Sequence, residues 1–229
     1  MAVMLAAWLS ALPAGSVCAT LGNPQLGKSW AMKTAAQSGA FGRLAVFEPY
    51  AKRDRKLYRA GLSPAAPWVG VYCSPRDLAK YPRELLSPPG ARVVVVPESE
   101  TDDPVGLGRE FSRVASVLWA TGGVDLLGEE VGLYGREAER AMMRLASGGG
   151  HALMRLFLVC QSLGRIQKDA RRHLNAVVSL PTGEPEDLES LRQRCGPEFV
   201  QRVAALDPED GSHAVAWRVG RGVAEVQTR

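Results

Sequence analysis

The chain has 229 residues, a length that suits one α/β domain or one domain with a small appendage. Hydrophobic residues make up 46% of it and charged residues 23%, which is the composition of an ordinary globular protein and excludes a disordered or fibrous chain. The formal net charge of +4 permits a nucleic-acid partner but does not require one. Because no apolar run reaches the roughly 20 residues of a membrane-spanning helix, we expect a chain that does not cross a membrane.

The four cysteines are far apart in the sequence, without a C-x-x-C pair and without clustered histidines. They are Cys18, Cys73, Cys160 and Cys195. This spacing indicates reduced thiols in a reducing compartment and no zinc site.

Residues 1–12 are apolar, but they lack the basic start of a signal peptide. A strand with a ligand-binding loop follows almost at once, so cleavage near residue 14 would leave that strand without a lead-in. We therefore expect residues 1–15 to be retained as a lead-in, either a short amphipathic helix or an edge strand that packs on the following domain.

A phosphate-binding loop follows the lead-in. Residues 22–29 match the complete G-x-x-x-x-G-K-[ST] pattern, between a predicted buried strand at 17–21 and a predicted helix at 30–37. The two glycines let backbone N–H groups turn toward one anion, Lys28 places its charge on the β- and γ-phosphates, and Ser29 offers its hydroxyl to Mg²⁺. We expect the nucleotide to contact Gly22, Asn23, Pro24, Gln25, Leu26, Gly27, Lys28, Ser29 and Trp30.

Beyond the loop, short apolar segments alternate with helical patterns. The predicted strands are 44–47, 69–73, 92–96, 124–128, 156–160, 176–180 and 214–217, with a proline-rich connection between the second and the third. The predicted helices are 105–121, 136–145, 166–173, 184–194 and 198–206. The alternation predicts an α/β fold, a P-loop NTPase with a mostly parallel sheet and helices on both faces. We expect this domain to span residues 16–218, followed by a tail at 219–229 that is an edge strand or frayed.

The strand predicted at 124–128 is followed by two glutamates. A site that hydrolyses ATP needs an acid that orients the metal and a group that polarises the attacking water. We assign Glu129 to Mg²⁺ through a water molecule, and Glu130 to the base that orients the attacking water. Asp125, inside the same strand, is the alternative metal residue. The other interpretation of the two glutamates is an acidic helix N-terminus that complements the helix dipole.

A polar residue also follows the buried strand predicted at 156–160. Gln161 stands at its carboxyl end, where a side chain in an open α/β sheet can reach a bound ligand. There it would contact the γ-phosphate and report its loss on hydrolysis. The alternative is a strand-end residue that turns into solvent.

The order of these motifs resembles the FtsK/HerA superfamily of DNA-pumping ATPases. In particular it resembles the compact genome-packaging ATPases of tailless double-stranded-DNA viruses with an internal membrane. The motifs are, in chain order, the loop at 22–29, Glu129-Glu130, the break at Gly150-His151, Gln161, the basic segment 166–173, the helix 184–194 and Cys195-Gly196. The resemblance covers roughly residues 16–217, and the order and spacing of its motifs carry most of it.

The resemblance implies a RecA/FtsK-like fold that binds ATP and Mg²⁺, hydrolyses ATP and translocates double-stranded DNA. Carried over by position, residues 22–29 are the Walker A loop, Glu129 and Glu130 stand at the end of Walker B, and Gln161 is the strand-end glutamine. The protein would be cytoplasmic in the host cell or associated with the virion at a capsid vertex. Capsid or internal-membrane proteins would then be further partners.

The resemblance also implies a homo-oligomeric ring, usually a hexamer, in which an arginine of one subunit completes the site of its neighbour. That arginine tends to precede the glutamine strand, where Arg144 and Arg155 are the candidates, with Arg140 and Arg136 behind them. Family members often have an arginine beside the histidine of the break, and this chain has Gly150 there, which leaves the choice open. Arg155 also stands out because a charge in an apolar segment has to be paired or lie at a subunit boundary.

Two basic segments, residues 52–56 and 168–172, are candidates for contacts with the DNA backbone. Such contacts give the sequence-independent, salt-sensitive binding that a translocating motor needs. Each segment fits an ordinary solvated surface equally well.

Three other functions fit a P-loop chain of this kind. A nucleotide or small-molecule kinase would act as a monomer and ignore DNA, although the sequence has no arginine-rich lid and no acceptor-binding motif. A Zot-like ATPase, which exports DNA during assembly of filamentous phages, typically carries a transmembrane segment after its ATPase domain, and we expect none here. A nucleotide-binding switch would bind ATP without turnover.

Overall fold

The structure is a computed structural model that describes residues 3–23, 25–51, 68–207, 209 and 211–228. Its strands are β1 (Val3–Met4), β2 (Val17–Leu21), β3 (Leu44–Phe47), β4 (Val71–Cys73), β5 (Arg92–Val95), β6 (Asp125–Gly128), β7 (Leu156–Val159), β8 (Ala176–Ser179), β9 (His213–Arg218) and β10 (Gly222–Gln227). Its α-helices are α1 (Leu5–Ser10), α2 (Lys28–Gln37), α4 (Pro75–Lys80), α5 (Pro82–Leu86), α6 (Pro104–Thr121), α7 (Glu139–Gly148), α8 (Lys168–Arg172), α9 (Pro185–Cys195) and α10 (Pro197–Ala204). Its 3₁₀ turns are η1 (Val131–Leu133), η2 (Arg136–Ala138) and η3 (Leu163–Arg165).

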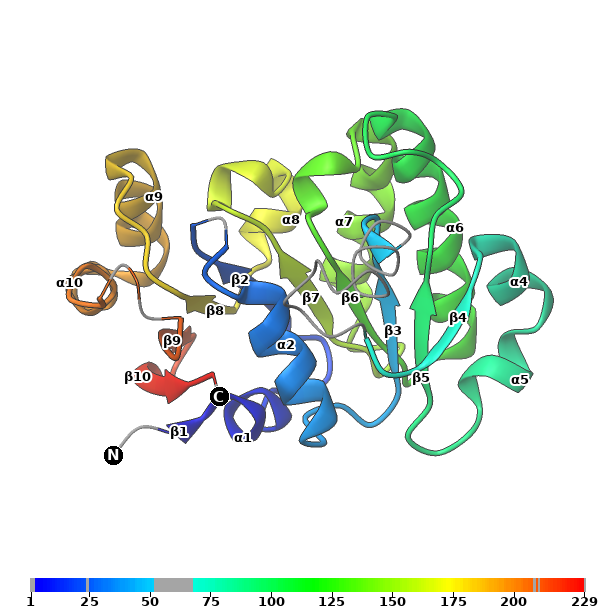
Figure 1. Cartoon of the computed structure of the whole chain (residues 1–229), viewed down its shortest axis with the longest axis horizontal. Coiled ribbons are helices and arrows are strands. Elements are labelled where there is room, and N and C mark those ends of the chain that lie inside the picture. The colour runs from blue at the N-terminus through cyan, green and yellow to red at the C-terminus, as the bar shows by residue number, and fades with distance from the viewer. Residues whose placement is uncertain (1–2, 24, 52–67, 208, 210, 229) are drawn as a thin grey trace.

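These strands form one ten-stranded sheet in the order β1-β10-β9-β8-β2-β7-β6-β3-β5-β4 (Figure 1). From β8 to β4 all neighbouring strands are parallel, whereas β9 runs antiparallel to both β8 and β10. The mostly parallel α/β sheet is therefore confirmed. Its topology brings the carboxyl ends of β2, β6 and β7 to one edge, which is where the predicted site residues follow their strands.

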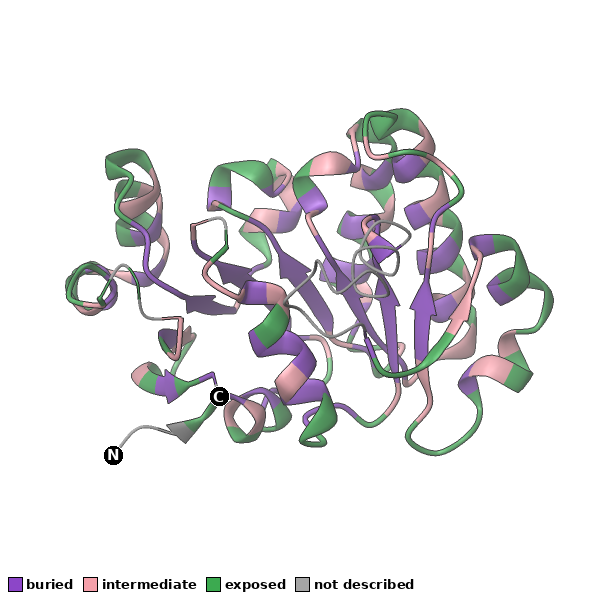
Figure 2. Cartoon of the chain, in the orientation of Figure 1, coloured by how far each residue is buried: buried purple, intermediate pink, exposed green. Residues whose placement is uncertain are grey.

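Helices cover both faces of the sheet, because successive side chains of its strands point to opposite faces. Along β2, Val17, Ala19 and Leu21 pack into the core beneath α6, α7, α8, α9 and α10. Cys18 packs instead into the core beneath α1 and α2. Figure 2 shows the central strands of the sheet buried between these two layers, whereas β4, β10 and the outer faces of the helices are partly exposed.

Several helices begin at a proline, which has no N–H to leave unpaired at the first helical position. They are α4, α5, α6, α9 and α10. The helices α4 and α5 lie in the segment predicted only as a proline-rich connection, and the sequence did not predict either helix. A capping box starts α4, since the Ser74 hydroxyl accepts from the Asp77 N–H at 3.1 Å and the Asp77 carboxylate accepts from the Ser74 N–H at 3.2 Å.

Both ends of the chain join the main sheet. The lead-in holds a strand and a helix, β1 and α1, and β1 pairs in parallel with β10 near the C-terminus. Figure 1 shows the two termini at the same end of the sheet. Among the described residues, no helix combines the length and the apolar character that crossing a membrane demands.

Candidate active site

The phosphate loop connects β2 to α2 at the carboxyl edge of the sheet, as the sequence predicts. Gly27, the residue before α2, has a φ of 83° in the left-handed region that favours glycine. The first turn of α2 contains no acidic residue and receives no side-chain cap, so its N–H groups face the loop as an anion site. Pro24 lies outside the described residues.

The loop is anchored to the segments that follow β7 and β8. The Gly22 N–H donates to the Gln161 carbonyl at 3.4 Å, and the Asn23 N–H donates to the Pro181 carbonyl at 3.2 Å. Gly22 has a φ of 145°, and a Cβ there would stand 2.9 Å from the Cβ of Leu180. Only glycine therefore fits this position without displacing the neighbouring strand end.

The Lys28 side chain folds back over the loop. Its ammonium group donates to the carbonyls of Gly22 and Asn23, both at 2.9 Å, and the residue is 6% exposed. Burial lowers the pKa of Lys28, and the carboxylates of Glu130 and Glu129 oppose that shift. A phosphate is a stronger acceptor than a carbonyl, so the same ammonium group is positioned to move to a bound nucleotide.

Ser29 and Glu129 meet across the sheet edge, although they are 100 positions apart in the chain. The Ser29 hydroxyl donates to Glu129 Oε2 at 2.8 Å. Glu129 is 1% exposed, and its Oε1 has no hydrogen-bond partner among the described residues. Hydroxyl and carboxylate oxygens are ligands that Mg²⁺ prefers. The pair fits a magnesium ion, as the sequence analysis assigns it.

The ion would be completed by phosphate oxygens and water. In the part of the chain that the structure describes, no three His, Cys, Asp or Glu side chains gather in a group able to hold a metal. Mg²⁺ is commonly bound in this way, through one or two protein ligands together with the phosphates of its nucleotide. The donor set around Ser29 therefore fits a metal that arrives with ATP.

A second buried carboxylate lies beside Glu129. Glu48 follows β3, the strand next to β6, and is 4% exposed. Its Oε1 accepts from the Tyr50 N–H and its Oε2 from the Trp68 indole N–H, each at 3.1 Å. Glu48 is a site residue beyond those predicted, and the signal for it is its place directly after a buried strand, which it shares with Glu129.

The electrostatics of Glu129 follow from this neighbourhood. Burial and then the Glu48 carboxylate raise the pKa of Glu129 to about 8, while the Ser29 hydrogen bond and the Lys33 ammonium oppose the rise. Lys33 lies one turn after Ser29 on α2 and is itself buried. A divalent cation at the unpartnered oxygen would favour the ionised carboxylate.

Glu130 lies in a strained turn directly after Glu129. Its backbone has φ 50° and ψ 51°, the left-handed region that costs a non-glycine residue about 1 kcal/mol. The fully buried Tyr134 holds this turn, because its hydroxyl donates to the Glu129 carbonyl at 2.5 Å. The Tyr134 ring packs against Phe47 and Phe111 at centroid distances of 5.2 and 4.9 Å. The sequence offered no signal for Tyr134 beyond an aromatic residue shortly after the acidic pair.

Glu130 and Gln161 face one small cavity of about 90 Å³. The structure thus brings the predicted base and the predicted strand-end glutamine together, next to the loop. Arg165, from η3, also lines this cavity and adds a positive charge that the sequence analysis did not assign to the site. A water molecule between these polar groups would have donors and acceptors on several sides.

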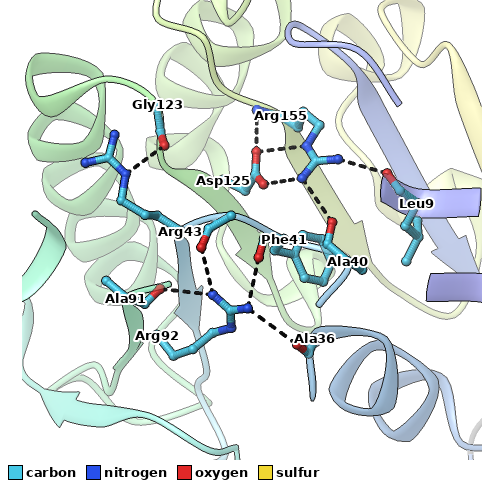
Figure 3. A network of polar contacts seen from close by, with 11 residues as sticks. Leu9, Ala36, Ala40, Phe41, Arg43, Ala91, Arg92, Gly123, Asp125 and Arg155 are labelled. Carbon is cyan, nitrogen blue, oxygen red and sulfur yellow. Dashed lines mark hydrogen bonds and ion pairs between the residues drawn. The ribbon is translucent and has the colours of Figure 1, made fainter. Parts of the chain in front are cut away.

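Asp125 and Arg155 lie at the opposite, amino edge of the sheet, where β6 and β7 begin (Figure 3). The Arg155 guanidinium contacts both carboxylate oxygens of Asp125, at 3.0 and 2.5 Å. It also donates to the carbonyls of Leu9 at 2.8 Å and Ala40 at 3.2 Å. This position keeps Asp125 away from Ser29 and from a metal that would bind there.

The Asp125 pair also explains why an arginine is tolerated in an apolar segment. The Arg155 side chain is 11% exposed and satisfied within its own chain, so no subunit boundary is needed to pair it. By contrast Arg136, Arg140 and Arg144 are exposed. Arg144 is on α7, and its guanidinium carbon lies 4.4 Å from the centre of the Trp119 ring of α6. Unlike Arg155, these three arginines lie on the surface of the chain.

Of the two basic segments, residues 52–56 fall outside the described residues. Residues 168–172 form α8, which follows η3 and packs on the face of the sheet opposite to α2.

Solved structures of similar fold put this geometry in context. The B204 DNA-packaging ATPase of Sulfolobus turreted icosahedral virus is 13% identical over 94% of this chain and 98% of its own, with a TM-score of 0.63. The genome packaging NTPase B204 of Sulfolobus turreted icosahedral virus 2, in complex with ATPγS, is 14% identical over 93% and 96%, with a TM-score of 0.62. VirB4 of Thermoanaerobacter pseudethanolicus is 11% identical over 92% and 88%, with a TM-score of 0.61.

The chain has the fold of a P-loop NTPase. This likeness confirms the fold class, and in fold it confirms the resemblance to FtsK/HerA-type ATPases such as the viral packaging enzymes. No family model matches the sequence, and no curated protein matches it either.

Proposed function

We propose that this protein is an Mg²⁺-dependent ATPase that translocates double-stranded DNA and packages a viral genome into a preformed capsid. The observation that carries the ATPase assignment is the hydrogen bond between Ser29 and Glu129. It joins the end of the phosphate loop to a buried carboxylate, one oxygen of which has no partner among the described residues, at the sheet edge where P-loop enzymes bind nucleotide.

Each residue of the site then has a role in hydrolysis. The N–H groups of the loop and Lys28 bind the β- and γ-phosphates. Ser29 and Glu129 would hold Mg²⁺, which would supply positive charge to offset the charge that develops on the phosphates. Glu130 accepts a proton from the attacking water, the bond from that water oxygen to the γ-phosphorus forms, and the bond to the ADP oxygen breaks. Gln161, in the cavity that it shares with Glu130, contacts the γ-phosphate and changes position when it leaves.

The DNA-packaging part of the proposal is supported by the likeness to B204 over nearly the whole length of both chains. A ring, most simply a hexamer, would place Arg144 of one subunit at the site of the next. In this account the protein acts in the host cytoplasm or at a virion vertex. Capsid or internal-membrane proteins would anchor it there.

The test is ATP hydrolysis by the purified protein with and without double-stranded DNA, with the oligomeric state recorded in the same buffer. We expect an oligomer whose turnover rises when DNA is added. Lys28→Ala should lose at least 100-fold in turnover, because it removes the charge that binds the phosphates. Lys80→Ala, which removes an exposed lysine of α4, is the matched control and should behave as the wild type.

Two results would overturn parts of this proposal. Turnover by a monomer that ignores DNA would contradict the translocase and favour a kinase with a small-molecule phosphate acceptor. Nucleotide binding without turnover, in the presence or absence of DNA, would contradict the ATPase and favour a switch.

A further inference from the structure

A basic groove of about 330 Å³ lies outside the nucleotide site, between α8 and α9. Lys168, Arg171 and Arg172 of α8 form one wall. Arg172 is partly neutralised by an exposed ion pair with Asp169 at 3.3 Å, and Arg171 donates to the Leu163 carbonyl at 3.4 Å. The wall therefore presents three cationic side chains, of which two have no carboxylate partner among the described residues.

The other wall comes from α9 and contributes Ser190, Gln193 and Arg194. Arg194 lies over the Trp217 ring at 5.9 Å, and one of its terminal nitrogens donates to the Arg172 carbonyl at 3.4 Å. Its Nε is buried and has no hydrogen-bond partner among the described residues. Because this Nε has almost no accessible surface, a ligand in the groove would contact the terminal nitrogens of Arg194 rather than the Nε.

The chemistry of the lining points to a phosphodiester rather than to an apolar ligand or a cation. Arginine, lysine, serine and glutamine are the side chains that contact phosphate and sugar in protein–DNA complexes. Guanidinium groups match the geometry of a phosphate with paired hydrogen bonds. No carboxylate lines the groove within the described ranges, and Leu163 is its apolar residue.

We propose that the groove between α8 and α9 binds the phosphate backbone of the translocated DNA. This inference rests on the proposed function and adds the surface through which each subunit holds its substrate. We expect binding that is independent of sequence, because contacts between cationic side chains and phosphates carry no sequence information.

The 3₁₀ turn η3 connects this groove to the nucleotide site. Leu163, at the start of η3, lines the groove, and Arg165, at its end, lines the cavity that contains Glu130 and Gln161. The helix α9 packs against η3 as well. A change in the cavity on loss of the γ-phosphate would therefore reach the DNA through a single turn of three residues.

The test is binding of a fluorescent 30-base-pair duplex to the full-length protein, measured by anisotropy over a range of NaCl concentrations. The groove variant is Lys168→Glu/Arg172→Glu, in which both changed residues are exposed. We expect at least tenfold weaker binding at moderate salt. The slope of log affinity against log salt should become shallower by about 2, because each lost phosphate contact contributes about 0.9.

Two further variants keep the result interpretable. Arg109→Glu/Arg113→Glu changes the charge by the same amount on the exposed face of α6, and should bind DNA as the wild type does. Gln193→Glu adds a negative charge from the α9 wall without changing α8, and should also weaken DNA binding. It provides the test if the double variant fails to fold.

Four outcomes are informative. Weakening by both groove variants but not by the α6 control supports the proposal. Equal binding by all folded variants contradicts the groove as the DNA-binding surface and leaves the proposed translocase function standing. Absence of DNA binding by the wild type overturns both. Displacement of the duplex by inorganic phosphate at concentrations where NaCl of the same ionic strength has no effect would show a free-phosphate site, which also overturns the proposal.

Discussion

At the scale of single residues, Glu129 destabilises the folded chain when it is ionised and no metal is bound. Its ordinary pKa of 4.5 applies to the unfolded chain, whereas burial and Glu48 raise it to about 8 in the folded one. Between these values the unfolded chain releases a proton that the folded chain retains. Raising the pH through this range therefore lowers the free energy of unfolding.

We predict that the stability of Glu129→Gln relative to the wild type, measured in EDTA, increases as the pH rises from 5 to 8. The amide carries no proton to lose and can still accept the Ser29 hydrogen bond. The gap in melting temperature should grow by on the order of 10 °C, since one unit of pKa shift is worth about 1.4 kcal/mol and 1 kcal/mol shifts the melting temperature of a chain of this size by about 2–4 °C. Glu84→Gln, an exposed change on α5, should show no such growth. If the melting temperatures of the wild type and Glu129→Gln change with pH in parallel, the raised pKa of Glu129 is contradicted.

Glu130 tests the chemistry rather than the stability of the site. We predict that Glu130→Gln binds ATP with nearly unchanged affinity but hydrolyses it at least 100-fold more slowly, because the amide cannot accept the proton of the attacking water. Equilibrium binding of a fluorescent ATP analogue and single-turnover hydrolysis measure the two effects separately. Retained turnover would transfer the role of the base to Glu129.

At the scale of elements, the sequence predicted every central strand and the phosphate loop, because buried parallel strands are continuous apolar runs and the loop has a fixed spacing. It failed at α4 and α5, where prolines suggested a connection. Ser74 and Asp77, spaced as a capping box, were a usable signal for α4. The pairing of Arg155 with Asp125 could not be predicted, because it depends on two strand starts that meet only in the fold.

The Asp125–Arg155 pair links β6 and β7 to α1 and to the segment after α2 (Figure 3). We predict that Asp125→Ala lowers the free energy of unfolding by about 3–5 kcal/mol, because it leaves a largely buried arginine without its counter-charge. Urea denaturation measures the loss. Glu198→Ala, which breaks an exposed pair with Arg202 on α10, should cost less than about 1 kcal/mol.

The same variant separates structure from metal binding. Well below its melting temperature, Asp125→Ala should still hydrolyse ATP with Mg²⁺, since Asp125 lies at the edge of the sheet opposite to Ser29. A folded Asp125→Ala protein with no activity would return Asp125 to the list of metal residues.

At the scale of the whole molecule, an active site shared between subunits predicts complementation. Arg144→Ala should bind ATP but be inactive alone. A Lys28→Ala subunit should also be inactive alone. In mixed rings some interfaces combine an intact loop with an intact arginine, so mixing the two should restore partial turnover. Arg155→Ala should give no such rescue, because its defect would be structural. Failure of Arg144→Ala to be rescued at any ratio would exclude it as the shared residue.

The central claim is that the chain converts ATP hydrolysis into movement along double-stranded DNA. The direct measurement is displacement of a labelled third strand from a duplex by the purified protein, with ATP and with ATPγS. We predict release with ATP, no release with ATPγS, and no release by Lys28→Ala under either condition. ATP hydrolysis at full rate on the same duplex with the third strand left in place would contradict the account.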